Sequence, residues 1–320
     1  WIPRGMLSLL GAAPGAGKSL LALDLARRLI HDLQLPDGEP VGIDAGRPVL
    51  YVDGEAVPQI LNERAASWGM DRDRLYLMLP DERCGMIDFG ADAEQARLTR
   101  KCHDLQPCLV VVDSLGAVSA RGENNVEDVR DILSFLGAVA REFDLALLLI
   151  HHLRKKGKYV PHTDLISVDD FRGSSHIVAI ARSVLALSVI QAGPQPDRNG
   201  PRRLEVVKTN LGRYPPPLGV RFDPSTGSGK GKVPRVRYAE PPRPYRAPSQ
   251  AEECSAWLVE LLEQAREPLQ PKEIVAAASD AGFTKGVLYR ARRNLEGIVV
   301  DTESKFSPKN RWKLAKPAAP

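Results

Sequence analysis

The stretch GAAPGAGKS at residues 11–19 constrains the fold of this chain more than any other feature of its sequence. Its glycines let successive backbone N–H groups point at one anion, and a helix that begins at its end would aim the positive end of its dipole there too. The apolar run Met6–Leu10 precedes the stretch, and apolar residues at helical spacing follow it over Leu20–Ile30. This order of strand, glycine-rich loop and helix predicts a phosphate-binding loop in an α/β fold.

The loop predicts ATP and Mg²⁺ as cofactors. Lys18 is expected to reach the β- and γ-phosphates and so to act in catalysis, and the Ser19 hydroxyl is expected to bind the metal. The pattern GxxxxGKS/T would place glycine where this chain has Ala12, and we expect Gly11 to supply part of the turn. The residues predicted to bind ATP are Ala13, Pro14, Gly15, Ala16, Gly17, Lys18, Ser19 and Leu20.

Carboxylates follow two other apolar runs. Asp113 ends the run LVVVD and is predicted to hold Mg²⁺ through water. Glu55 follows the run LYVD and is a candidate for polarising the water that attacks the γ-phosphate. The spacing alone fits equally well an exposed Glu55 at the start of a helix, and Asp53 is the competing carboxylate.

Two histidines, His151 and His152, end the apolar run Leu145–Ile150. Neighbouring residues of a strand point to opposite faces, so one of the two is expected to face the nucleotide. No carboxylate or thiol stands at a metal-ligand spacing from them, so we do not predict a zinc site.

Apolar runs alternate with helical stretches through the first two-thirds of the chain, which predicts a parallel sheet flanked by helices. The polar segment Lys155–Arg172 is aperiodic and predicts a mobile loop. Helices are expected at Ala93–Leu105 and Val126–Phe143, and further strands at Val49–Val52, Leu75–Leu79, Ser183–Val189, Leu204–Lys208 and Val220–Phe222.

Proline and charge divide the rest of the chain. Residues 213–248 contain nine prolines without apolar periodicity, and residues 224–248 carry six Lys and Arg against one acid. We therefore predict an α/β domain over residues 1–223, a basic extended linker over 224–248 and a second domain over 249–316. The linker sequence GSGKGK is not predicted to be another phosphate loop, because no strand precedes it and no helix follows it.

The second domain shows three helical patterns followed by two short strands, which is typical of a small winged helix-turn-helix domain. Its net charge changes from −5 over residues 249–283 to +6 over residues 284–320. The third helix, KGVLYRARRNL, would enter the major groove of DNA, and a protein-docking role is the alternative. The residues of this helix predicted to contact DNA are Lys285, Arg290, Arg292 and Arg293.

The composition narrows the class of protein. With 43% hydrophobic and 26% charged residues, the chain is expected to be globular rather than disordered. No apolar run approaches ~18 residues, so no membrane span is expected. The four cysteines show no CxxC pairing, which favours a reduced, cytoplasmic protein.

Along the chain, the phosphate loop is followed by YVDGE, LVVVDSL, LLLIHHLRK, FRGSSHIVAIARSVLAL and VVKTN. This ordered set resembles the RecA-like ATPases of the plasmid RepA type, relatives of the DnaB-type replicative helicases, over about residues 1–223. The resemblance implies a RecA-like fold with Glu55 as the catalytic base. It also implies that His151 or His152 senses the γ-phosphate and couples it to DNA. DnaB-type loops begin with Ala as well, which accounts for Ala12.

The resemblance further implies a homo-oligomeric ring, often a hexamer, in which a basic residue of the neighbour completes each ATP site. The matching stretch is Lys208-Thr209-Asn210. Lys208 fits this catalytic role, but Asn210 stands where the relatives carry an Arg, and Arg213 is the candidate substitute. Arg64, on the helix expected after Glu55, is a weaker match to a basic residue of this kind. The segment Lys155–Arg172 corresponds to mobile pore loops, so contacts to DNA are expected from Lys155 and Lys156 and from the neighbouring Arg154 and Lys158.

These expectations favour an ATP-dependent motor on single- or double-stranded DNA, as in a replicative helicase of a plasmid, phage or integrated element. The alternative is an ATP-switched DNA-binding regulator or loader without unwinding activity, and nothing in the sequence separates the two. A DNA-binding protein with a decayed ATPase is disfavoured, because Lys18, Ser19, Glu55 and Asp113 are all present. A kinase is disfavoured because the chain shows no signature of a lid or an acceptor site.

Overall fold

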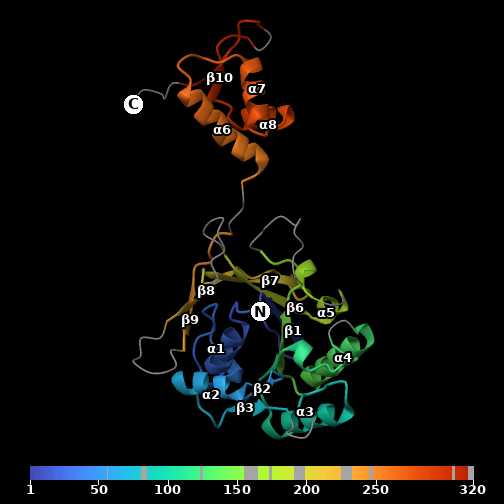
Figure 1. Ribbon diagram of the computed structural model, residues 1–320. Helices are drawn as coiled ribbons and strands as arrows, with labels where there is room; N and C mark the ends of the chain where they lie inside the picture. Colours follow the sequence, from blue (N-terminus) through green and yellow to red (C-terminus); the bar gives the residue numbers. More distant parts are fainter. Residues whose placement is uncertain are drawn as a thin grey trace. The chain divides into compact units, whose positions relative to one another are not determined.

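A computed structural model gives the structure of the chain, which forms two compact units, Trp1–Tyr245 and Arg246–Pro320 (Figure 1). Each unit is described by itself below. The structure describes residues 1–55, 57–80, 85–122, 125–154, 165–172, 175–190, 199–224, 233–244, 248–304 and 307–315. None of the helices in these ranges is both long and apolar enough to cross a membrane.

The first unit is built on a nine-stranded sheet with the strand order β3-β2-β4-β5-β1-β6-β7-β8-β9. The strands from β3 to β6 in this order run parallel, and β7, β8 and β9 continue the sheet antiparallel. Their bounds are β1 Met6–Ala12, β2 Val49–Asp53, β3 Leu75–Met78, β4 Leu109–Asp113, β5 Ala146–His152, β6 Ser183–Val189, β7 Arg202–Thr209, β8 Leu218–Asp223 and β9 Arg235–Ala239.

Helices cover both faces of this sheet, α1 and α2 on one side and α3 and α4 on the other (Figure 1). The central strands are therefore largely apolar, as in β4, where all five residues are buried and only the last, Asp113, is charged. Each helix contributes its apolar stripe, such as Leu21 and Leu23 of α1 or Leu133 and Leu136 of α4. The helix bounds are α1 Lys18–Ile30, α2 Pro58–Ser67, α3 Asp92–Leu105, α4 Val126–Glu142 and α5 Ser175–Ile180.

The predicted linker differs from the structure, because part of it is an edge strand of the sheet. Residues Arg235–Ala239 form β9, which pairs with β8. The Tyr238 hydroxyl donates a hydrogen bond of 2.9 Å to Oδ2 of Asp24 on α1, a fully buried carboxylate that also forms ion pairs with Arg27 and Arg28. The prolines of this segment flank the strand, where they interrupt no ladder of hydrogen bonds. The first unit therefore extends about 20 residues beyond the predicted boundary at residue 223.

The second unit has the predicted elements, helices α6 Gln250–Gln264, α7 Pro271–Asp280 and α8 Lys285–Asn294, with β10 Val299–Asp301 antiparallel to β11 Trp312–Leu314. Local sequence sets the helix starts: Ser249 and Glu252 form a capping box, Pro271 occupies the first turn of α7, and Thr284 caps α8. A separate apolar core holds the unit together and includes Leu258, Ile274, Leu288 and Trp312.

Candidate ATP site at the carboxyl edge of the sheet

Strand register brings the ends of four strands together at one edge of the sheet. β5 lies between β1 and β4, with His151 level with Gly11 and His152 level with Ala12. On the other side of β4, Asp53 pairs in register with Asp113. The phosphate loop, the histidines and the carboxylates therefore meet at the carboxyl ends of the parallel strands, where open α/β sheets bind ligands.

The phosphate loop adopts a conformation that its glycines permit. Gly17 has a φ of +103°, in the region that favours glycine, and a Cβ there would lie 2.1 Å from the ring of Phe222 on β8. Lys18 is buried, and its ammonium group donates hydrogen bonds to the carbonyl oxygens of Ala12 at 3.1 Å and Ala13 at 3.3 Å. Burial lowers the pKa of Lys18, while the charges of Asp113 and Glu55 act in the opposite direction. The lysine thus folds back over the loop, where its charge can meet bound phosphates.

Tyr51 connects the two residues that were predicted to hold the metal. Its hydroxyl donates a hydrogen bond of 2.6 Å to Oδ2 of Asp113, and it also forms a hydrogen bond with the side chain of Ser19. Burial raises the pKa of Tyr51 well above its usual value, as does the charge of Asp113, so the hydroxyl remains a donor. Hydroxyl and carboxylate oxygens are the ligands that Mg²⁺ prefers, so Ser19 and Asp113 fit this ion. Tyr51 was missed because its spacing on β2 marks it only as a buried strand residue.

Glu55 faces a small cavity beside the phosphate loop. Its side chain is 51% exposed, and Oε1 lies 4.0 Å from Nε2 of His152. The cavity is lined by Glu55, Ser114, Gly116, Ala117, His152 and Arg172. A carboxylate in this position has room for a water molecule in front of it. Arg172 was missed as a site residue because the sequence placed it at the end of a polar loop.

The competing carboxylate, Asp53, is occupied by the backbone. It is buried, and its Oδ2 accepts a hydrogen bond of 2.9 Å from the N–H of Val57, ahead of the first turn of α2. Burial raises the pKa of Asp53, against the effect of that hydrogen bond. An inward-facing carboxylate with a structural partner is less suited than Glu55 to receive a proton from water.

The side chains of the two histidines lie in different surroundings at the end of β5, as expected for neighbouring residues of a strand. His152 lies in the cavity with Glu55, whereas His151 is fully buried and its Nε2 lies 2.7 Å from the carbonyl oxygen of Arg172. His151 also stacks on Phe171 at 6.2 Å between ring centroids. Phe171 in turn leaves no room for a side chain at Gly11, where a Cβ would lie 2.4 Å from its ring. The end of the predicted mobile segment is therefore packed against the strand that leads into the phosphate loop.

Lys208 and Arg213 lie at the opposite, amino edge of the sheet. Thr209 at the end of β7 pairs with Ser183, the first residue of β6. The Lys208 ammonium group donates hydrogen bonds to the carbonyl oxygens of Val178, Ala179 and Ala181 at the end of α5, at 2.6, 3.0 and 3.0 Å. Burial lowers the pKa of Lys208, as does the charge of Arg182. Arg213 is exposed in the turn that follows β7.

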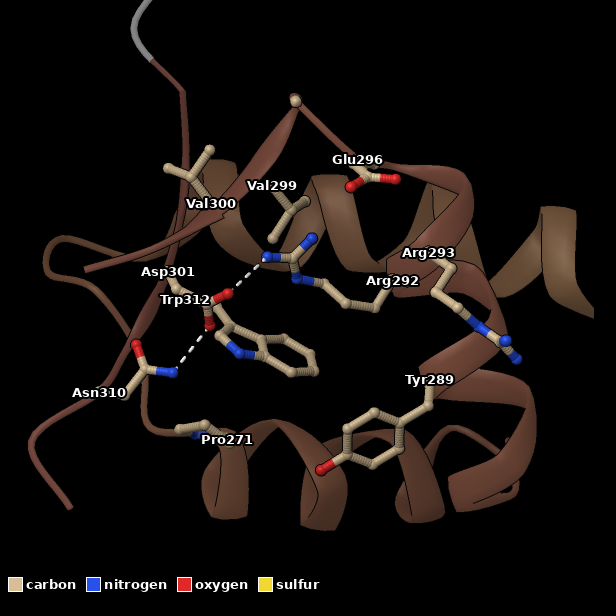
Figure 2. Close-up of a pocket in the computed structure, with 11 residues that line it drawn as sticks. Pro271, Tyr289, Arg292, Arg293, Glu296, Val299, Val300, Asp301, Asn310 and Trp312 are labelled. Atoms are coloured by element: carbon tan, nitrogen blue, oxygen red, sulfur yellow. Dashed lines mark hydrogen bonds and ion pairs between the residues drawn. The ribbon is translucent and has the colours of Figure 1, made fainter. Parts of the chain in front are cut away.

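The residues of α8 that were predicted to contact DNA differ in their exposure to solvent. Lys285, Arg290 and Arg293 are exposed on α8, whereas Arg292 is turned inward. Arg292 pairs with Asp301 on β10 at 3.1 Å, keeps 16% of its side chain exposed, and lies 5.3 Å above the ring of Trp312 (Figure 2). Arg292 thus joins the hairpin to α8, a contact within the unit that the sequence did not predict. Lys155, Lys156 and Lys158 lie outside the described residues.

Known proteins resemble this chain over about half to two-thirds of its length. Residues 1–158, slightly less than half of the chain, match a family model described as an AAA domain. The DNA repair protein RadA of Halalkalibacterium halodurans is 27% identical over 186 residues, which are 55% of this chain and 35% of that protein. RadA of Mycobacterium tuberculosis is 28% identical over 162 residues, 49% of this chain and 28% of that protein. The chain therefore spans about a third of the length of these curated relatives.

Among solved structures, a KaiC-like protein from Pyrococcus horikoshii is similar, with a TM-score of 0.50 and 18% sequence identity, over 69% of this chain and 87% of that one. This likeness confirms the expected RecA-like fold, a mostly parallel sheet flanked by helices. The narrower expected resemblance, to RepA and DnaB-type proteins, is not what these relatives support, since both curated ones are RadA proteins.

Proposed function

We propose that this chain, a RecA-like P-loop ATPase, is an oligomeric motor that uses ATP to act on DNA. The observation that carries the proposal is the cavity that contains Glu55 and His152. It lies at the end of β5, where His152 is level with Ala12 of the phosphate loop, and β5 leads directly into the predicted DNA loop. The RadA relatives are named DNA repair proteins, which agrees with DNA as the partner. Within this class we favour a replicative helicase of a plasmid, phage or integrated element.

The chain's own groups fit each step of ATP hydrolysis. Lys18 and the backbone of residues 13–20 would bind the phosphates, and Ser19 and Asp113 would hold Mg²⁺, which when bound spreads the negative charge of the phosphates. Glu55 would orient the attacking water and accept its proton. His152, 4.0 Å from Glu55, would respond to the γ-phosphate at the same place. Most of the rate enhancement would come from positioned charges.

The segment after β5 offers a route from the ATP site to DNA. Leu153 and Phe171 form an antiparallel bridge, and the N–H of Arg154 donates a hydrogen bond of 2.8 Å to the carbonyl oxygen of Asp170. The two ends of the segment are therefore clamped together next to His151 and His152. Lys155 and Lys156, just beyond this clamp, would contact DNA phosphates. Movement of His152 would thus reach the base of a DNA-binding loop directly.

The second unit would supply a further contact to DNA as a winged helix. Lys285, Arg290 and Arg293 are exposed on α8, the helix that would enter the major groove. The antiparallel pair of β10 and β11 would form the wing. A protein-docking role for this unit remains the alternative, and it would favour the regulator or loader described above.

A forked duplex separates these functions. We expect the full chain with ATP and Mg²⁺ to unwind it, and single-stranded DNA to stimulate ATP hydrolysis, with Lys18→Ala protein as the inactive control. Stimulated hydrolysis without strand separation would instead identify an ATP-switched regulator or loader. Hydrolysis that no form of DNA changes would overturn the proposal that DNA is the partner.

A further inference from the structure

A cavity of about 690 Å³ lies in the second unit, between α8 and the hairpin of β10 and β11 (Figure 2). Its volume falls in the range of cavities that bind small molecules. Aromatic rings form part of its wall, where Tyr289 stands edge-on to Trp312 with 5.9 Å between the ring centroids. Trp312 is buried, whereas Tyr289 is 41% exposed, so the tyrosine ring is the aromatic surface that a ligand can reach.

The cavity also offers hydrogen-bonding groups of both kinds. The Nε–H of Arg292 is buried and has no hydrogen-bond partner among the described residues, which is costly unless a ligand supplies an acceptor. Another nitrogen of the same guanidinium is occupied, because it pairs with Asp301 at 3.1 Å. The carboxylate of Glu296, exposed at the rim, supplies acceptors. A flat ligand with donors and acceptors along its edge, such as a nucleobase, fits this set.

Exposed cations beside the cavity favour a base that belongs to a nucleic acid. Lys285, Arg290 and Arg293 are exposed on α8, and in the part of the chain that the structure describes none of them pairs with a carboxylate. Residues 284–320 carry a net charge of +6. Cations spaced along a helix attract the phosphates of a strand. Phosphates held there would bring the bases of that strand next to the ring of Tyr289.

The position of the cavity along α8 suits an unpaired base rather than a paired one. In a helix-turn-helix, the first residues of the recognition helix contact the bases of the major groove. Tyr289 and Arg293 lie on the later turns of α8, and Glu296 follows its end, so the cavity would lie beside the DNA backbone. A base within a duplex can turn into such a cavity only by losing its pairing and stacking, whereas an unpaired base loses little.

We propose that this cavity binds one unpaired base next to a duplex, with the ring of Tyr289 as the stacking surface and the Nε–H of Arg292 as a donor to the edge of the base. The inference rests on the proposed DNA partner. It makes the substrate of the second unit a junction between double-stranded and single-stranded DNA. A motor that separates strands creates such a junction as it advances, so the second unit would hold the chain at that point.

Two DNAs that differ by a single base test the assignment. Both are duplexes with the same single-stranded overhang, but in one of them the first unpaired nucleotide is an abasic analogue, so the number of phosphates is equal. The full chain should bind the complete overhang about fivefold to a hundredfold more tightly, since stacking of one base on an aromatic side chain has about this effect. Tyr289→Ala should bind both DNAs with the affinity of wild type for the abasic one, and Tyr289→Phe should keep the preference.

Controls separate stacking from folding and from charge. Ile298→Ala removes a side chain that is 52% exposed beside the cavity, and it should keep the preference for the complete overhang. The fluorescence of 2-aminopurine at the unpaired position should be quenched by wild type and by Tyr289→Phe but not by Tyr289→Ala. Hydrogen exchange over residues 285–294 should show that α8 is folded in every variant.

The comparison of the two DNAs with wild-type protein needs no variant, so it decides the question even if Tyr289→Ala does not fold. Equal binding of the complete and the abasic overhang by wild type would overturn the role of the cavity while leaving DNA as the partner. A preference that survives in folded Tyr289→Ala would overturn the stacking role of Tyr289. A chain that binds neither DNA would overturn both this inference and the proposed function.

Discussion

The ATP site and the outer face of α8 use charged side chains in opposite ways. At the ATP site, Lys18, Asp113 and Asp53 are buried, and each has a defined partner in the fold. On α8, Arg290 and Arg293 are exposed, and among the residues that the structure describes neither forms an ion pair. Buried charges are costly unless paired, so the fold dictates their positions, whereas exposed charges are free to serve a partner. Arg292 lies on the exposed helix but belongs to the first kind.

The largest effect is expected from Lys18→Ala. Loss of its charged hydrogen bonds to the phosphates should weaken ATP binding about tenfold to a hundredfold and abolish turnover. Titration with a fluorescent ATP analogue measures the affinity, and phosphate release measures the turnover. Unchanged affinity would mean that the buried lysine serves the fold rather than the ligand.

The variants Arg292→Ala and Arg293→Ala test the difference between a partnered and an exposed charge within α8 itself. Removal of Arg292 leaves Asp301 without its cation and uncovers Trp312, which should destabilise the second unit by about 2 kcal/mol. Arg293→Ala should change stability by less than about 0.5 kcal/mol. Hydrogen exchange of residues 285–301 in the full chain distinguishes the two, and equal protection in both variants would contradict the internal role of Arg292.

Tyr238→Phe tests whether β9 is part of the first unit. The substitution removes one hydrogen bond to the buried Asp24 and should cost about 1 kcal/mol of the free energy of unfolding. Faster hydrogen exchange over residues 235–239, with α8 unaffected, is the expected observation. If hydrogen exchange over residues 235–239 is the same in Tyr238→Phe as in wild type, the segment behaves as the extended linker predicted from its prolines.

The smallest effect concerns DNA affinity. Arg293→Ala should reduce the slope of log affinity against log salt by about one unit if this residue neutralises one phosphate. Duplex binding by the full chain, measured at several salt concentrations, gives the slope. A loss confined to one DNA sequence would instead indicate that Arg293 reads a base.

The sequence predicted the regular elements well because their patterns are local. Strand β6, Ser183–Val189, matches its expected range, and the order of loop, carboxylate and histidine residues was enough to expect a shared site. Strand β9 was missed because five residues between prolines carry too short an alternation to outweigh the prolines. The strand is held by its pairing with β8 and by the hydrogen bond from Tyr238 to Asp24, more than 200 residues earlier in the chain.

The sequence does not predict the role of a side chain whose partners are distant in the chain. Arg292 and Arg293 are identical neighbours in the sequence, and only the position of Asp301 and Trp312 assigns one of them inward. Arg172 joins the cavity of Glu55 because the chain returns alongside β5 after the polar segment. Lys208 was expected to complete a neighbour's ATP site, and nothing in its sequence surroundings predicts the three acceptors that the end of α5 supplies.

Turnover by Glu55→Gln tests the central claim most directly. The amide keeps the size of the side chain but cannot accept a proton, so steady-state hydrolysis should fall about a hundredfold to ten-thousandfold. Binding of ATP should stay close to wild type, since Lys18 and the loop are unchanged. Near-full hydrolysis by Glu55→Gln, together with its loss in Asp53→Asn, would contradict the assignment of Glu55 as the base.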